Sequence, residues 1–147
     1  MSAPDLTLRR MIDGPVEAVF RAWTDPHTLA LWWGPPSFST PVAEMDVRPG
    51  GAYRHVMRSP DGAQELCVEG TYREVEPPRR LVFSWRWEGG VPDDMESLVT
   101  VELHPHGERT ELVLTHGGFT DDVAARPYGD GWEGSLPKLA ALFASSA

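Results

Sequence analysis

The sequence predicts an α+β domain in which a seven-stranded antiparallel sheet buries one face against a C-terminal helix. Apolar and polar residues alternate in six segments between Val42 and His116, a pattern typical of half-buried strands. Apolar residues recur at helical spacing in two short segments near the N-terminus and again near the C-terminus. A sheet with one apolar face needs a covering layer, and the last of these helices supplies one.

The N-terminal part combines one strand with two short helices. Leu6–Ile12 is expected as a strand, and a turn at Asp13-Gly14-Pro15 leads into a helix over about residues 15–24. A second helix begins after Asp25-Pro26 and continues through Trp33, where Gly34-Pro35-Pro36 ends it. The apolar residues on the two helices are Val16, Val19, Phe20 and Trp23, then Leu29, Leu31, Trp32 and Trp33.

Six further strands follow, separated by turns rich in proline and glycine. His104-Pro105-His106 is assigned to the last of these turns, because proline interrupts the alternation there. The strands are expected over residues 42–47, 53–58, 65–75, 81–87, 98–104 and 110–116.

Residues 132–144 return to helical spacing. Pro137 permits two interpretations: either the helix starts near Ser135 with Pro137 in its first turn, or a longer helix starts before residue 132 and kinks at Pro137. The apolar face of this helix consists of Trp132, Leu136, Leu139 and Phe143.

Length and charge restrict the possible functions. The 147 residues suit a single domain, without internal repeats. With 13 basic and 22 acidic residues, the net charge of −9 disfavours nucleic acid and anionic membranes as partners. No signal peptide is visible and no apolar run approaches the roughly 20 residues that span a bilayer, so a cytoplasmic location is expected. The lone Cys67 excludes an intramolecular disulfide and is expected as a small buried residue.

Six segments, in this order, carry a resemblance to a known family: RAWTDPHTLALWWGPP, MDVRPGGAYRHVMRSPDG, GTYREVEPPRRLVFSWRWE, VTVEL, RTELVLTHGGF and GWEGSLPKLAALF. From about Leu6 to Phe143, the chain is similar to the bacterial branch of the activator of heat-shock-protein-90 ATPase homologue family, in the START-like (SRPBCC) superfamily. The resemblance implies one helix-grip domain over residues 1–147, in which a curved sheet wraps a long C-terminal helix around a cavity. The superfamily includes carriers, cyclases, oxygenase subunits and chaperone co-factors, so fold alone does not select a function.

The candidate binding residues are those expected to face the cavity. Trp85 and Trp87 place two large rings on one face of a strand, which favours a ligand-lining role for at least one, with core packing as the alternative. Trp32 and Trp33 point about 100° apart on a helix, so we expect one in the core and the other at the pocket or its rim. The full candidate set is Trp32, Trp33, Tyr53, His55, Met57, Phe83, Trp85, Trp87, Val99, Leu114, His116, Trp132 and Leu136.

Two histidines in this set could carry chemistry. His55 and His116 share the inward phase, and an imidazole titrates near neutral pH, so a general acid or base is one interpretation and a hydrogen-bonded structural histidine the other. No metal-ligand spacing, nucleophile elbow or phosphate loop occurs, so no metal or other cofactor is expected. Asp46 and Glu69, if inward, would need an arginine partner such as Arg48; outward, solvated positions are the alternative.

Three functions are compatible with this pattern. The first is non-enzymatic binding of a small hydrophobic or aromatic molecule in a cavity between the sheet and the C-terminal helix. The second is a single-domain chaperone co-factor that acts by surface docking in the stress response, as the resemblance implies. The third is a cyclase- or hydrolase-like enzyme with a cavity histidine as acid or base. The sequence leaves open whether the molecule is a monomer or a homodimer.

Overall fold

A computed structural model of the chain describes residues 6–34, 37–87, 96–118 and 122–143, with side chains in the last helix described from residue 131 onward. The element types and their order are those predicted. They are β1 (Leu6–Ile12), α1 (Val16–Thr24), α2 (Pro26–Ala30), β2 (Ser39–Met45), β3 (Ala52–Arg58), β4 (Glu65–Glu76), β5 (Arg80–Trp87), β6 (Ser97–His106), β7 (Arg109–Gly117) and α3 (Asp122–Ala141).

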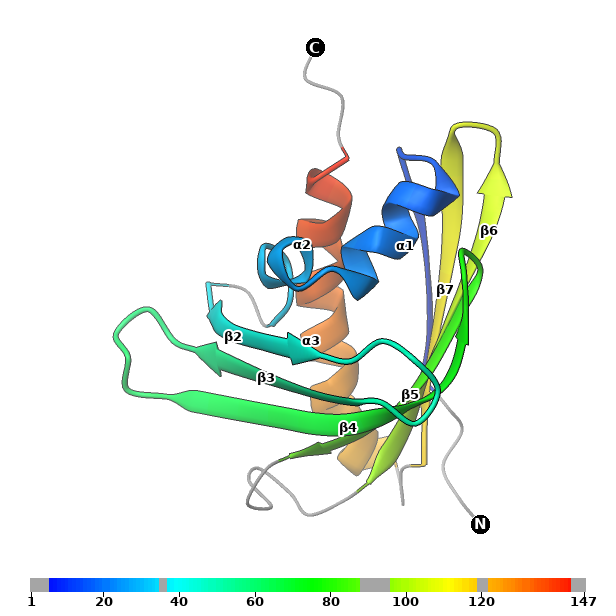
Figure 1. Cartoon of the computed structure of the whole chain (residues 1–147). Helices are drawn as coiled ribbons and strands as arrows, with labels where there is room; N and C mark the ends of the chain where they lie inside the picture. The colour runs from blue at the N-terminus through cyan, green and yellow to red at the C-terminus, as the bar shows by residue number, and fades with distance from the viewer. Residues whose placement is uncertain (1–5, 35–36, 88–95, 119–121, 144–147) are drawn as a thin grey trace.

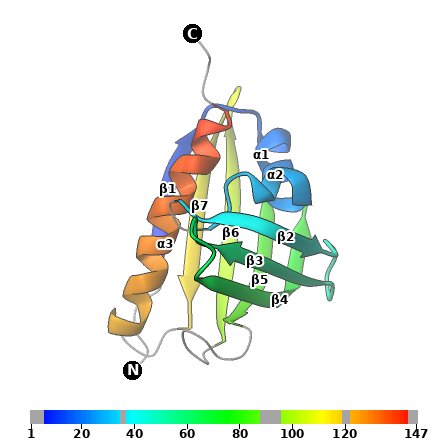
Figure 2. The ribbon, with the colours of Figure 1, turned by 90° about the vertical axis from the view of Figure 1, so that its left-hand side faces the viewer.

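The seven strands form one antiparallel sheet in the order β1-β7-β6-β5-β4-β3-β2. The N-terminal strand β1 pairs with β7 from Leu6↔His116 to Ile12↔Thr110, so the first strand joins the end of a meander formed by the others. The sheet bends strongly: β1, β6 and β7 run alongside α3, whereas β2, β3 and β4 cross it (Figures 1 and 2). This is the helix-grip arrangement, and the predicted fold class is confirmed.

The second helix is shorter than predicted. The Asp25 carboxylate caps it by accepting from the backbone N–H of Thr28 at 3.0 Å, and Pro26 occupies its first turn. The helix ends at Ala30, so Trp32 and Trp33 lie beyond it. Two neighbours on one helix cannot both face the core, and leaving the helix early lets the chain bury both rings.

The hairpin between β6 and β7 is longer than predicted. Its strands remain paired through Pro105↔Thr110 and His106↔Arg109, so His104-Pro105-His106 belongs to a strand and the assignment to a turn is wrong. The turn has two residues, and its Gly107 has a φ of 68°, as such turns require. Pro105 is tolerated because β5 pairs with β6 only as far as Arg80↔Glu102.

The C-terminal helix α3 starts ten residues before the predicted range of 132–144 and ends three residues before the end of that range. Because α3 begins at Asp122, the longer helix of the second interpretation is confirmed, and Pro137 lies in the helix interior on an exposed face; the kink at Pro137 stays a prediction. Ser135 does not start the helix; its hydroxyl donates to the carbonyl of Gly34 at 2.6 Å. This bond ties α3 to the segment that follows α2.

The strand residues that face the interior are those predicted. Asp46 and Glu69, whose orientation the sequence left open, both face outward. Asp46 is exposed and paired with Arg48, with 2.8 Å between Oδ2 and Nε. Glu69 lies on the outer face of the sheet, opposite Arg54. Cys67 is half-buried instead of buried, because it alternates with the inward Val68 and therefore faces outward.

Candidate functional site

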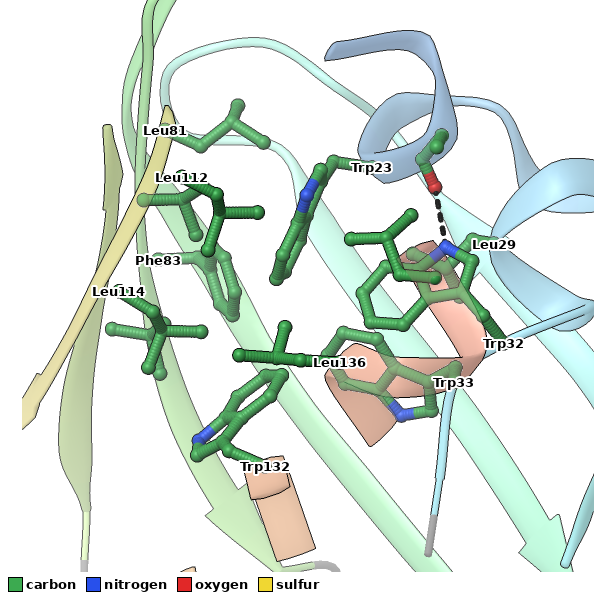
Figure 3. Packing of buried hydrophobic residues seen from close by; sticks show 14 of the residues in the cluster. Trp23, Leu29, Trp32, Trp33, Leu81, Phe83, Leu112, Leu114, Trp132 and Leu136 are labelled. Atoms are coloured by element: carbon green, nitrogen blue, oxygen red, sulfur yellow. Dashed lines mark hydrogen bonds between the residues drawn. The ribbon is translucent and has the colours of Figure 1, made fainter. Parts of the chain in front are cut away.

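The interior of the domain is dominated by ring side chains, here called the aromatic cluster. They come from α1, the segment after α2, strands β3, β4, β5 and β7, and α3, so every layer of the fold contributes. Figure 3 shows five of them, Trp23, Trp32, Trp33, Phe83 and Trp132. The cluster consists of Trp23, Trp32, Trp33, Tyr53, His55, Tyr72, Phe83, Trp85, Trp87, His116 and Trp132. All thirteen predicted candidate residues are buried, each with at most 9% of its surface exposed.

Trp33 lies at the centre of the aromatic cluster. Its indole stacks on Trp85, with ring centroids 5.6 Å apart and planes inclined by 27°. Trp132 and Trp23 meet it edge-on, at 5.5 Å and 6.3 Å. His55 lies 5.0 Å away on a further side. Trp33 is therefore enclosed by aromatic walls contributed by four different elements.

The two adjacent tryptophans differ in their hydrogen bonding. Trp32 is fully buried, and its Nε1–H donates to the carbonyl of Ala22 at 3.0 Å (Figure 3). Trp33 is 3% exposed, and its Nε1–H has no partner among the described residues. Trp33 also lines an internal cavity, whereas Trp32 does not. Trp32 thus occupies the core position of the expected pair, and Trp33 the cavity position.

The internal cavity has a volume of about 10 Å³, enough for about one water molecule. It lies between the two short helices and strands β3–β5, and none of the α3 residues with described side chains, from residue 131 onward, lines it. A ligand cavity between the sheet and α3 stays a prediction. Four of the predicted candidates, Trp33, Tyr53, His55 and Phe83, line the cavity together with Trp23, Leu29 and Tyr72.

Sequence reasoning missed those last three lining residues for identifiable reasons. Trp23 and Leu29 were expected as apolar residues of two short helices, and nothing in their spacing points to a cavity. Tyr72 lies two residues after Gly70 in β4. A register shift between Tyr72 and Glu74 obscures the alternation of apolar and polar residues in this strand. Its aromatic side chain at even spacing from Val68 was the usable signal.

Three residues of the aromatic cluster each carry a buried ring nitrogen with no hydrogen-bond partner among the described residues: Nε1 of Trp23, Nε1 of Trp33 and Nδ1 of His55. All three residues line the internal cavity, and each is at least 97% buried. Leaving a buried polar group unpaired costs about 1–3 kcal/mol. Such groups are rare in native interiors, and these three share one location.

His116 has both ring nitrogens engaged. Trp132 Nε1–H can only donate, and it lies 3.0 Å from His116 Nδ1, so Nδ1 accepts and the ring proton sits on Nε2. Nε2–H therefore donates to the Ser97 hydroxyl at 2.7 Å. Desolvation by burial lowers the pKa of His116 to about 3, so the ring is neutral. A neutral ring with both nitrogens bonded has no lone pair for a substrate proton, which supports the structural interpretation of His116.

His55 is also kept neutral by burial, which lowers its pKa to about 4; the nearby backbone of Arg54 acts in the opposite direction, without a hydrogen bond of good geometry to Nδ1. Its ring packs against Tyr53, with centroids 5.0 Å apart. Burial raises the pKa of Tyr53, whose hydroxyl donates to the carbonyl of Ser84 at 2.5 Å. Besides Tyr53, the titratable group that lines the cavity with His55 is Tyr72, whose pKa burial also raises, so both phenols stay protonated at neutral pH.

A second hollow is an open groove of about 750 Å³ on the outer face of strands β2–β5. Charged residues of alternating sign face one another across these strands, Glu44 opposite Arg54 and Glu69 opposite Arg86. The lining has four acidic and three basic residues, so its charges nearly balance. The described residues contain no group of three or more His, Cys, Asp or Glu that could hold a metal ion. Within the same residues, every helix is too short or too polar to cross a membrane.

Residues 13–144 match the family model for activator of Hsp90 ATPase homolog 1-like protein. The chain belongs to this family. A crystal structure of a protein from Chromobacterium violaceum is 31% identical with a TM-score of 0.86, covering 95% of this chain and 96% of that one. The AHSA1 protein of Silicibacter pomeroyi is 34% identical with a TM-score of 0.81, covering 94% and 96%.

CalU16 from Micromonospora echinospora is also similar, at 28% identity and a TM-score of 0.71, with coverage of 95% of this chain and 76% of that one. No curated protein matches the sequence. The predicted family is confirmed, and the fold it implies is of a ligand-binding or co-chaperone type.

Proposed function

We propose that this protein binds a small hydrophobic or aromatic molecule in its interior, without catalysing a reaction on it. The observation that carries the proposal is that Trp23, Trp33 and His55, each with a buried ring nitrogen that has no partner among the described residues, line one internal cavity. An apolar side chain at these positions would avoid the cost of an unpaired buried polar atom. Polar atoms that the protein leaves unpaired are the usual means by which an apolar site orients a ligand.

Binding requires the interior to open locally. The internal cavity of about 10 Å³ is far below the roughly 300–1,000 Å³ of ordinary ligand pockets, so a ligand must displace side chains or separate the short helices from the sheet. Ring contacts dominate the interior, and rings can be replaced by a ligand ring with little loss of contact energy.

The test is native mass spectrometry of the full chain, freshly purified under non-denaturing conditions. A retained small molecule, released on denaturation and identified by its mass, is the expected result. The same spectrum reports whether the molecule is a monomer or a homodimer. The proposal would be refuted if the purified chain carried no ligand and bound none of a panel of apolar and aromatic compounds.

Trp85 and Trp87 provide a second test, because both rings face the interior. Trp85→Ala and Trp87→Ala should each fold but bind an apolar fluorescent probe more weakly than the wild type. Unchanged probe binding by both variants would count against a ligand wall at this position.

Family membership supports a second candidate, a chaperone co-factor that docks through its surface. Docking by apolar contact needs a contiguous exposed patch. The large exposed apolar side chains of the described residues, Met11, Leu31, Leu98 and Leu142, come from four separate parts of the chain. Interior binding is therefore the better-supported function. Co-elution of the protein with a purified Hsp90-type chaperone in size-exclusion chromatography would reverse this order.

A further inference from the structure

The internal cavity cannot itself hold an aromatic ring. Its volume is about 10 Å³, whereas a cavity that accepts benzene measures on the order of 150 Å³. If the proposed function is correct, an aromatic ligand must therefore take the place of a side chain already present. The question is which of the lining residues gives way.

Trp33 is the lining residue least fixed by regular structure. Trp23 and Leu29 belong to helices, and the other four lining residues belong to strands β3, β4 and β5. Trp33 follows the end of α2 and precedes Gly34, whose φ of 104° is accessible to glycine at little cost. A rotation of Trp33 breaks no helix or strand hydrogen bond.

Hydrogen bonding favours the displacement as well. The Trp33 indole N–H is buried without a partner among the described residues, so it gains one when the ring moves toward water. The backbone on both sides is held independently of the ring: Thr40 Oγ1 donates to the Trp33 carbonyl at 2.7 Å, and Ser135 Oγ donates to the Gly34 carbonyl. The ring can therefore leave while the segment remains attached to β2 and α3.

The space that Trp33 occupies is shaped for a planar ring system. Trp85 forms a wall nearly parallel to it, and Trp132 forms a wall at 87°. A flat bicyclic molecule would keep both contacts. Trp23 lines the same cavity with its ring centroid 6.3 Å from that of Trp33, and its N–H, which can only donate, has no partner among the described residues. The ligand should therefore carry an acceptor.

We propose that the Trp33 indole occupies the site of a planar aromatic ligand of about two fused rings, whose carbonyl or other acceptor oxygen takes the N–H of Trp23. This inference rests on the proposed function and specifies its ligand class and its displaced residue. Binding exchanges the Trp33 ring for the ligand ring against Trp85. Because Trp23 is a donor, the site selects acceptor-bearing molecules over hydrocarbons of equal shape.

The test uses coumarin as probe, which is a planar bicycle with a carbonyl acceptor and no N–H or O–H donor, and naphthalene as its acceptor-free counterpart. The side-chain N–H signals of the tryptophans are followed by two-dimensional ¹H–¹⁵N NMR on the full chain. Coumarin should shift the Trp23 and Trp33 signals with one common Kd. The Trp32 signal should respond only to the changed ring current of Trp33, whose centroid lies 5.6 Å away, because its N–H is already bonded to Ala22.

Three variants sharpen the result. Trp33→Ala should bind coumarin at least about tenfold more tightly, since no ring has to be displaced, whereas Leu31→Ala, at a 68% exposed position of the same segment, should match the wild type. Trp23→Phe keeps a ring but loses the donor, and should weaken coumarin by about five- to tenfold while leaving naphthalene unchanged. The wild-type NMR titration decides the question alone if Trp33→Ala does not fold.

The outcomes separate this inference from the function on which it rests. If coumarin or naphthalene binds while the Trp23 and Trp33 signals stay in place, the protein binds aromatic molecules elsewhere, and the inference is wrong while the function stands. If coumarin and naphthalene bind equally well and Trp23→Phe affects neither, the acceptor requirement is wrong. If neither compound binds the wild type or Trp33→Ala, the inference fails, and native mass spectrometry decides the function separately.

Discussion

The two buried histidines should make this protein sensitive to mild acid, and His55→Phe isolates the contribution of one of them. Burial lowers the pKa of His55 to about 4 and of His116 to about 3, against about 6.5 in an unfolded chain. Between pH 6.5 and pH 4 the unfolded state therefore binds more protons than the folded state. Stability is then fully present above pH 6.5 and is lost as the pH falls.

The magnitude follows from these pKa values. Lowering the pH from 7 to 5 favours the unfolded state by about 2 kcal/mol for a group with a folded pKa of about 4, and by a similar amount for one of about 3. Over this change of pH, the two histidines together lower the free energy of unfolding by about 4 kcal/mol, which is a large share of the 5–15 kcal/mol of a typical domain. His55→Phe should reduce the loss by about 2 kcal/mol, because phenylalanine does not titrate.

The assay is urea unfolding at pH 7 and pH 5, at constant ionic strength, for the wild type, His55→Phe and the control His27→Asn. His27 is exposed at the surface of α2, so its variant should keep the wild-type loss. Comparing each variant with itself at two pH values removes any change in packing that the substitution causes. An equal loss in wild type and His55→Phe would show that His55 is not held neutral by burial.

Three substitutions test the packing directly. Ser97→Ala takes the hydroxyl acceptor away from the His116 Nε2–H and should lower the free energy of unfolding by about 1–3 kcal/mol in urea at pH 7. An unchanged free energy of unfolding would contradict this hydrogen bond. Gly70→Ala would drive a Cβ into the backbone carbonyl of Ser84 on β5 and should cost about 3 kcal/mol or more by the same assay, whereas Gly131→Ala, in open space on α3, should stabilise by up to about 1 kcal/mol. Phe143→Ala should lower stability by about 2–3 kcal/mol, less than for a fully buried ring, and an unaltered melting curve would show that this ring does not hold the end of α3.

The strands could be predicted from the sequence because apolar and polar residues alternate along them, and the alternation shows which side chains face the interior. The expected inward set, from Tyr53 to His116, is buried throughout. The error at Pro105 arose because proline was treated as a chain break. A strand tolerates proline where no neighbouring strand needs its N–H, and β5 ends before it could pair with Pro105. That information belongs to the sheet, and no local pattern contains it.

The start of α3 could not be predicted for the opposite reason. Its first half contains Pro127 and Gly129, residues that disfavour a helix, and lacks a regular apolar stripe. The helix forms there nonetheless, so tertiary context overrides propensity. The same limit applies to the internal cavity: Trp23 and Tyr72 come from segments remote in sequence, and only the fold brings them together.

The contrast between Trp32 and Trp33 follows from one proline. The carbonyl of Ala22 would normally accept the N–H of residue 26, but that residue is Pro26, which has none. The carbonyl stays available at the end of α1, and the Trp32 indole takes it at 3.0 Å. No comparable free acceptor among the described residues reaches Trp33, so its N–H stays unpaired. Trp32 is therefore locked by the chain, whereas Trp33 is held by ring contacts that a ligand ring could replace. This difference between adjacent residues of identical type makes Trp33, and not Trp32, the residue to follow in a binding experiment.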